Sequence, residues 1–225
     1  MAGLRSWTVP AREPGTGPAP VAILLHGVGA NETGMLGLAE ALDPRFAKLV
    51  LRAPLAFGPG SFGWFHVDFT PSGPVHHAAE AEASRALLAD WIPGAVRDLG
   101  GDPGRVYLLG FSQGAIMSVS LLLTRPDLVA GVAAWSGRTL PEALRNRHPG
   151  PELAAREALV IHGRDDRTLP VQHGRSTRDA LQAIPLARVE YHELAMGHEV
   201  TDASLALTGA WLARAAGFPG TAGAP

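Results

Sequence analysis

Short apolar runs alternate with longer helix-like segments along most of this chain, and this alternation constrains the fold more than any other feature. Residues 21–25, Val-Ala-Ile-Leu-Leu, are apolar throughout, which is typical of a strand buried on both faces of a parallel sheet. The pattern predicts an α/β fold, a mainly parallel, doubly wound sheet flanked by helices. Further strands are predicted at 48–52, 106–109, 129–135, 158–161 and 188–192, and helices at about 32–42, 75–99, 113–124, 171–183 and 203–216. We expect the Pro93-Gly94 pair to end or kink the second helix.

The 225 residues are enough for one large core, and no shift in composition marks a second domain. We expect an N-terminal segment at 1–20, a single domain at 21–216 and a flexible C-terminal tail at 217–225. Two segments, 54–74 and 136–156, are longer than simple connections but too short for a separate cap domain. Both should emerge at the carboxyl ends of the strands, where ligands bind in an open α/β sheet.

The composition excludes several classes of site and partner. The chain has no cysteine, so thiol nucleophiles, disulfides and cysteine-ligated zinc are excluded. A formal net charge of −2 gives no reason to expect a nucleic acid or an anionic membrane as a partner. Residues 1–20 lack the apolar core of a signal peptide and no run reaches the length of a membrane span, so we expect a cytoplasmic protein without stable membrane insertion. Glu80 does not complete a His-Glu-x-x-His zinc signature with His76-His77, and we expect no metal or organic cofactor.

The pentapeptide Gly110-Phe111-Ser112-Gln113-Gly114 lies between a predicted strand and a predicted helix. A serine between two such glycines at a strand-to-helix turn is typical of a nucleophile elbow. The serine sits on a sharp, strained turn, so small residues on either side must let the neighbouring backbone approach closely. The turn also places the hydroxyl at the N-terminus of a helix, where developing negative charge is favoured.

A serine hydroxyl needs a base to accept its proton and a third group to orient that base. In nucleophile-elbow enzymes the order along the chain is serine, acid, histidine. The predicted strand at 158–161 is followed by Asp165 and Asp166, and these residues alone leave the choice between them open. The strand at 188–192 is followed by His198, in a loop that leads into the last helix. We therefore predict a triad of Ser112, one of the two aspartates and His198.

The oxyanion that forms during acyl transfer needs two preorganised N–H donors. One should be the backbone N–H of Gln113, directly after the nucleophile, and the other should come from the loop that follows the strand at 21–25. His26 and His162 each precede a glycine at a strand end, and we expect a structural role for both.

Four motifs together resemble the bacterial carboxylesterase and phospholipase family of α/β-hydrolases, which includes acyl-protein thioesterases and small lysophospholipases. They are Leu24-Leu25-His26-Gly27-Val28-Gly29, the Ser112 pentapeptide, His162-Gly163-x-x-Asp166 with Pro170, and Met196-Gly197-His198-Glu199-Val200. The resemblance runs from about residue 21 to 216. It implies an α/β-hydrolase fold, Asp166 rather than Asp165 as the acid, and Val28 as the second oxyanion donor. It also implies that Trp64, Phe65 and Met196 line an acyl pocket, and by analogy a homodimer is expected.

The chain departs from the family pattern near the site. Ala115 follows the elbow where many members have another glycine, a change that should be tolerated. Gly63-Trp64-Phe65-His66 resembles an aromatic segment of the family but has His66 where an aspartate is usual, with Asp68 two residues later. This departure bears on the shape of the pocket and not on the chemistry.

The sequence therefore predicts a serine carboxylesterase that hydrolyses a small-molecule carboxylic ester or thioester through an acyl-enzyme. Because no large cap is expected, short or medium acyl chains are favoured. An acyl-protein thioesterase or a lysophospholipase with the same triad is the nearest alternative. A catalytically silent hydrolase-fold binding protein is the alternative from another class.

Overall fold

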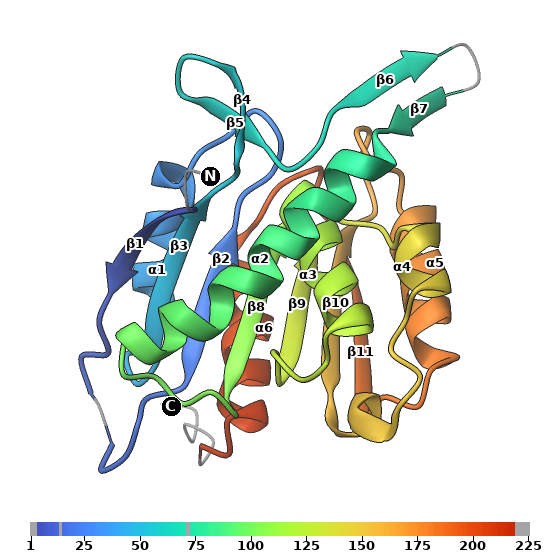
Figure 1. Ribbon diagram of the computed structural model, residues 1–225. Coiled ribbons are helices and arrows are strands. Elements are labelled where there is room, and N and C mark those ends of the chain that lie inside the picture. Colours follow the sequence, from blue (N-terminus) through green and yellow to red (C-terminus); the bar gives the residue numbers. More distant parts are fainter. Residues whose placement is uncertain (1–3, 14, 71–72, 219–225) are drawn as a thin grey trace.

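Seven strands form the central sheet of the computed structural model, which describes residues 4–13, 15–70 and 73–218 (Figure 1). The order across the sheet is β1-β3-β2-β8-β9-β10-β11, with every neighbouring pair parallel except β1 and β3. The strands are β1 (Arg5–Val9), β2 (Val21–Leu25), β3 (Ala47–Arg52), β8 (Val106–Phe111), β9 (Gly131–Trp135), β10 (Glu157–Gly163) and β11 (Arg188–Leu194). The predicted α/β class with a mainly parallel sheet is confirmed. For each predicted strand, the observed first and last residues lie within two residues of the predicted ones.

Strand β1 was not predicted. It pairs antiparallel with β3 at the edge of the sheet, and its burial alternates between exposed and half-buried residues. Such alternation is typical of a strand with one solvated face, and five residues are too few for it to stand out in a sequence. The sheet therefore begins within the segment that was expected to precede the domain.

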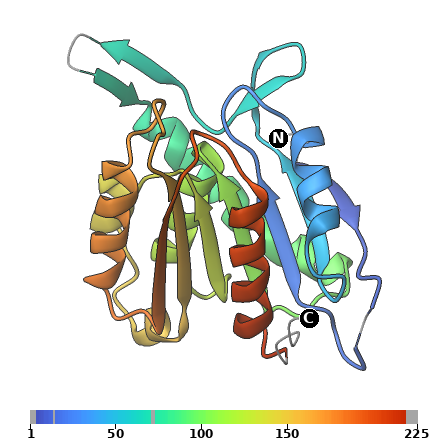
Figure 2. The same ribbon diagram turned by 180° about the vertical axis from the view of Figure 1, so that it is seen from behind.

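Helices cover both faces of the sheet. Helices α1 and α6 lie on one face (Figure 2), and α2, α3 and α5 pack on the other (Figure 1). The helices are α1 (Thr33–Ala41), α2 (Ala78–Asp98), α3 (Gln113–Thr124), the short α4 (Pro141–Arg145), α5 (Gln172–Gln182) and α6 (Asp202–Ala215).

Helix α2 begins later than predicted and runs through the proline at which it was expected to end or kink. It does not end at Pro93 but continues to Asp98, because Ile92 and Val96 on either side of the proline are both buried in the core. Packing of these side chains outweighs the hydrogen bond that proline cannot donate. Residues 75 and 76, predicted to be helical, instead belong to strand β7 (Gly73–His76).

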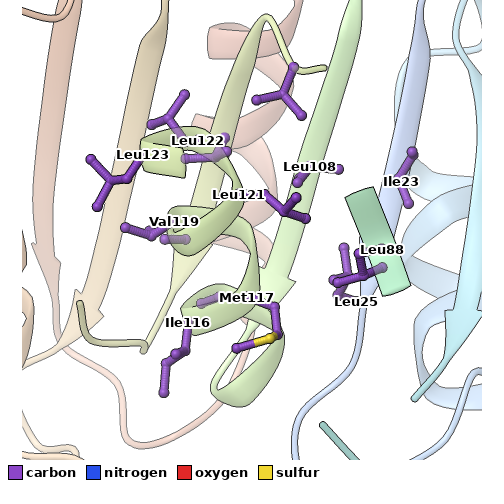
Figure 3. Packing of buried hydrophobic residues seen from close by; sticks show 14 of the residues in the cluster. Ile23, Leu25, Leu88, Leu108, Ile116, Met117, Val119, Leu121, Leu122 and Leu123 are labelled. Atoms are coloured by element: carbon purple, nitrogen blue, oxygen red, sulfur yellow. The ribbon is translucent and has the colours of Figure 1, made fainter. Parts of the chain in front are cut away.

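The core divides into two layers because successive side chains of each strand point to opposite faces. Ile23 and Leu25 of β2 pack with residues of β8, α2 and α3 (Figure 3). Ala22 and Leu24 of the same strand pack with residues of α1 and α6. Helix α3 is buried from Gln113 through Leu123, so the element that follows the elbow is anchored on all sides.

The segment 54–74 is not a simple loop. Two antiparallel hairpins lie beyond the carboxyl ends of the parallel strands (Figure 1). They are formed by β4 (Leu55–Gly58) with β5 (Ser61–Gly63), and by β6 (Val67–Thr70) with β7. The segment 136–156 contains α4 and a single 3-10 turn at Pro151–Ala155.

The start of the predicted C-terminal tail packs on the domain. The Phe218 ring lies edge-on to Phe46 with 5.7 Å between centroids, and the Arg45 guanidinium lies 3.9 Å from the Phe218 centroid. Phe218 of the predicted tail thus packs on the domain, and the remaining part of that tail, 219–225, lies outside the described residues. Across the described ranges, no helix combines the length and the apolar character needed to cross a bilayer.

Candidate active site

Strand β2 marks the point where the strand order reverses. The chain continues from β2 to β3 on one side and returns later through β8 on the other side. In open α/β sheets, ligands bind outside the carboxyl ends of the strands at such a switch point. The loop 26–29 follows β2 and Ser112 follows β8, so both lie there.

Ser112 stands in the turn between β8 and α3 with φ 54° and ψ −114°, a conformation that residues other than glycine rarely adopt. Its N–H donates to the carbonyl oxygen of Trp135 at 2.9 Å. A Cβ on Gly110 would overlap the backbone of Gly114, and a Cβ on Gly114 would overlap the carbonyl of Leu25. The two glycines therefore permit the close approach that a nucleophile elbow requires.

Ser112, His198 and Asp166 form a hydrogen-bonded chain. His198 Nε2 lies 3.0 Å from Ser112 Oγ, and His198 Nδ1 lies 2.7 Å from Asp166 Oδ2. A neutral imidazole with its proton on Nδ1 can donate to the carboxylate and accept the hydroxyl proton at Nε2. Asp165 is exposed, and its N–H donates to the carbonyl of Met196 at 3.1 Å. Of the two aspartates, Asp166 is the one that meets His198.

The side chain of Asp166 is fully buried and is held by its own loop. Oδ1 accepts the N–H groups of Thr168 at 2.9 Å and Leu169 at 2.7 Å. Nε2 of the buried His162 donates to the carbonyl of Leu169 at 2.7 Å and lies 3.4 Å from Asp166 Oδ2. One carboxylate oxygen thus holds the loop while the other faces His198.

The position of His198 depends on close packing between the loops that follow β10 and β11. A Cβ on Gly163 would overlap the carbonyls of Met196 and Gly197, so only glycine lets the second loop lie this near. The Phe111 ring supports the imidazole, with 4.8 Å between the ring centroids. The His198 side chain is 17% exposed, so the base is ordered by its neighbours and still accessible to a substrate.

His26 fixes the start of the loop after β2. Its Nδ1–H donates to the carbonyl of Gly27 at 2.7 Å, and its Nε2 accepts the N–H of Ala53 at 3.0 Å. The indole N–H of Trp64 donates to the carbonyl of His26 at 2.9 Å. Burial lowers the pKa of His26, which favours the neutral ring that accepts this N–H. These contacts give His26 a structural place beside the site.

Val28 lies in the exposed part of this loop, with 49% of the residue accessible. The N–H of the next residue, Gly29, donates to the carbonyl of Phe62 at 2.8 Å and fastens the loop to β5. Among the described residues, the backbone hydrogen bonds that hold the loop do not use the N–H of Val28. The N–H of Gln113 is the first of α3 and has no acceptor within the helix. Both predicted donors are therefore available to a bound oxygen.

The side chain of Gln113 has a role that sequence reasoning missed. Its Oε1 accepts the N–H of Trp64 at 2.9 Å, and its Nε2 donates to the carbonyl of Phe65 at 2.7 Å. The Gln113 amide thus fixes the backbone of Trp64 and Phe65, and the Trp64 indole in turn binds the carbonyl of His26. The available signal was a glutamine at the start of an otherwise apolar helix, because a buried amide must find hydrogen-bond partners.

The structure does not bring the three predicted pocket residues together. Trp64 and Phe65 are buried in the core layer shared with α2 and α3, whereas Met196 is buried in the layer shared with α1 and α6. All three have 5% or less of their surface exposed. They act here as core residues that support the site from opposite faces of the sheet.

His66, the departure from the family pattern, is exposed and has a partner of its own. Its Nδ1 lies 2.8 Å from a carboxylate oxygen of Glu80 in α2, which also accepts the His66 N–H at 2.7 Å. His77 Nε2 lies 2.9 Å from Asp68 Oδ2. These pairs tie the β6–β7 hairpin to the start of α2. Within the described ranges, no three histidine, aspartate or glutamate side chains are grouped so that they could hold a metal ion.

Comparison with known proteins identifies the family of this chain. The sequence model of one protein family, described as Phospholipase/Carboxylesterase, matches residues 11–213. The chain belongs to this family. The predicted resemblance is confirmed, and with it membership of a hydrolase family with the α/β-hydrolase fold.

Named relatives come from bacteria, fungi and plants. The chain is 32% identical over 164 residues to the putative esterase NocK of Nocardia uniformis subsp. tsuyamanensis, a match that covers 72% of the chain and 44% of that longer relative. It is 29% identical over 202 residues to acyl-protein thioesterase 1 of Mycosarcoma maydis, covering 80% of the chain and 84% of the relative.

Solved structures show the same fold at low sequence identity. The carboxylesterase of Bacillus cereus superposes with a TM-score of 0.80 at 19% identity, covering 94% of each chain. Esterase PE8 superposes with a TM-score of 0.80 at 22% identity, covering 95% of this chain and 99% of the other. At these identities the likeness concerns the fold alone.

Proposed function

We propose that this protein is a serine carboxylesterase that hydrolyses a small-molecule carboxylic ester or thioester through an acyl-enzyme. The hydrogen-bonded chain of Ser112, His198 and Asp166 carries this proposal. It places a hydroxyl, a base and a buried carboxylate in the geometry that nucleophilic catalysis needs.

In acylation, Ser112 Oγ attacks the acyl carbonyl carbon while His198 Nε2 takes the hydroxyl proton. Asp166 Oδ2 holds the proton on Nδ1 and stabilises the imidazolium that forms. The N–H groups of Val28 and Gln113 donate to the oxyanion, where each such donor is worth about 3 to 4 kcal/mol of transition-state stabilisation. His198 then gives its proton to the leaving alcohol or thiol, and the tetrahedral intermediate collapses to the acyl-enzyme.

Deacylation repeats these roles with water. His198 takes a proton from a water molecule as its oxygen attacks the acyl-enzyme carbonyl, and returns that proton to Ser112 Oγ as the acid leaves. The same two N–H donors face the second oxyanion. Every group in both steps belongs to the chain, the substrate or water.

We expect short or medium acyl chains to be preferred. The segment 54–74 forms two short hairpins and 136–156 contains only the short helix α4 and a 3-10 turn, so neither is a large cap over Ser112 (Figure 1). An acyl-protein thioesterase is a second candidate, because a relative of that name aligns over 80% of the chain. A survey of aryl esters, thioesters and lysolipids of increasing chain length separates these activities. Long-chain lysolipids as the far better substrates would contradict the short-chain proposal.

A fluorophosphonate probe tests the nucleophile and distinguishes an enzyme from a silent binding protein. We expect covalent labelling of the wild type and none of Ser112→Ala. Ser136→Ala is the matched control, because Ser136 also has a positive φ of 48° at a strand end but its hydroxyl is buried without a hydrogen-bond partner. Absent labelling of the wild type, or labelling that survives Ser112→Ala, would overturn the proposal.

A further inference from the structure

Arg138 lies beside the proposed nucleophile but takes no part in the chemistry described above. It follows β9, whose last residue, Trp135, accepts the N–H of Ser112. The preceding residue, Gly137, packs so tightly on the elbow that an added Cβ would lie 2.5 Å from the Ala115 Cβ and 3.4 Å from the carbonyl oxygen of Ser112. The backbone that carries Arg138 is therefore fixed against the elbow itself.

The guanidinium of Arg138 has no carboxylate partner among the described residues. Its Nη2 lies 3.3 Å from Nδ1 of His76, a ring that carries at most one positive charge and no negative charge. The other nitrogen of the His76 ring, Nε2, lies 3.2 Å from a carboxylate oxygen of Glu142. Glu142 also forms an ion pair with Arg145 at 3.1 Å. Arg138 is half-buried, and this burial lowers its pKa, an effect that the negative charge of Glu142 offsets only in part.

Helix α5 supplies no carboxylate that binds Arg138 directly. The positive charge of Arg138 adds to burial in lowering the pKa of His173, the second residue of α5, which favours its neutral form. Asp166, which also acts electrostatically on His173, has its oxygens committed to His198 and to its own loop. The Arg138 guanidinium therefore lies near β7 and α4, on a loop packed against the elbow, with no carboxylate of the described residues bound directly to it.

All but one of the other arginines of the described ranges differ from Arg138 in this respect. Most form an ion pair with an aspartate or glutamate, as Arg145 does with Glu142. Among the described residues, five further arginines without an ion pair are exposed, at positions 5, 12, 147, 164 and 167. Arg156 is half-buried and its Nε has no hydrogen-bond partner, but it lies at the amino end of β10, the end of the strand remote from Ser112. A partly desolvated cation to which no carboxylate binds directly costs free energy, which an anionic ligand would offset.

We propose that Arg138 binds an anionic group of the ester that Ser112 attacks, so that the preferred substrate carries a carboxylate or a phosphate in addition to its scissile ester. This inference rests on the proposed esterase function and adds the charge of the substrate to it. A planar guanidinium can bind either anion with two parallel N–H bonds, which orients the substrate as well as attracting it. Arg138 is thus a specificity-determining residue that touches a part of the substrate remote from the scissile bond.

Two matched pairs of substrates test this charge preference and locate the anion. The first pair is the p-nitrophenyl monoester of glutaric acid and its methyl ester, which differ by a carboxylate on the acyl side. The second is butyryl glycerol phosphate and monobutyrin, which differ by a phosphate on the alcohol side. We expect the wild type to prefer the anionic member of at least one pair, and that pair identifies the source of the anion.

The variants are Arg138→Gln and Arg138→Lys, with Arg145→Gln as control because Arg145 is exposed and contacts the same Glu142. Arg138→Gln should lower kcat/KM for the preferred anionic ester about 10- to 100-fold, mainly through KM, as expected for a charge-assisted hydrogen bond. Activity on the neutral partner should stay within about twofold, which also shows that the variant is folded. Arg138→Lys should restore part of the loss, and Arg145→Gln should behave as wild type.

Two results would overturn the assignment of Arg138. One is a wild type that shows no preference for the anionic ester in either pair. The other is an Arg138→Gln variant that loses neutral and anionic activity equally, which a merely structural role would produce. A wild type that cleaves none of the four esters and is not labelled by a fluorophosphonate fails the proposed function itself, and this inference with it.

Discussion

Two regions flank Ser112 and differ in their hydrogen bonds. On the β2 side the hydrogen bonds join neutral groups, whereas on the β10–β11 side they join the ionisable side chains of Asp166 and His198. The β2 side is the loop 26–29 with Trp64 and Phe65, joined by the Gln113 amide and the Trp64 indole. The β10–β11 side is the pair of loops that carry Asp166 and His198. The difference follows from the proposed tasks. A backbone N–H that stabilises an oxyanion only has to stay in place, while an acid–base pair has to move a proton.

The largest effect should come from removing the charge on the β10–β11 side. Asp166→Asn should lower kcat by about 10⁴-fold with the fold retained, because an amide no longer holds the imidazole proton on Nδ1. Steady-state kinetics and a thermal melt measure the two effects. Asp165→Asn is the control, since Asp165 is exposed, and should stay close to wild type. Equal losses in the two variants would contradict the assignment of Asp166.

A steric change on the same side should have the next largest effect. Gly163→Ala places a Cβ against the carbonyl of Met196, which displaces the His198 loop. A shift of this size should lower kcat/KM about 100-fold. Gly197→Ala is a matched control in the displaced loop, because its Cβ would meet only Glu199 Oε1 at 3.7 Å. If Gly163→Ala retained wild-type kinetics, the close packing of the two loops would not be what positions His198.

On the β2 side, Gln113→Ala should act on stability more than on chemistry. The buried N–H of Trp64 and carbonyl of Phe65 lose their partners, which should cost about 2 kcal/mol of unfolding free energy. The oxyanion donor at Gln113 is a backbone N–H and remains, so activity should fall only about tenfold, less than for loss of a donor. Urea unfolding and ester kinetics measure both, with the exposed Gln182→Ala as control. A loss of activity as large as that of Asp166→Asn would remove the distinction between the two sides.

The smallest effect should be a pH dependence of stability on the β2 side. Because the pKa of His26 is lowered in the folded state, the unfolded chain binds a proton below about pH 6.5 that the folded chain does not. Stability should therefore be complete above that pH and decline as the pH falls, by at most about 1.4 kcal/mol per pH unit for this residue. Urea unfolding at about pH 5.5 and 7.5 measures this decline. His26→Gln should flatten it, whereas an unchanged slope would show that His26 is not the source.

Much of the fold was readable from short patterns. The inner strands were predicted because residues such as 21–25 are buried on both faces and so must be apolar without interruption. Strand β1 and the two hairpins of 54–74 were not predicted, because short, partly exposed strands carry no such run. Helix α2 was predicted to end or kink at Pro93, but the buried residues that carry it onward to Asp98 are visible only as packing.

By itself, the sequence determined the parallel strands of the sheet, the elbow serine, and the order of acid and base that follow it, because these depend on local periodicity and on neighbours along the chain. The clamp made by Gln113, the placement of Trp64 and Met196 in opposite core layers, and the unpaired charge of Arg138 were decided only by the tertiary structure. Each is a relation between segments far apart in the chain. Partners, burial and counter-charge exist only once those segments are folded against one another.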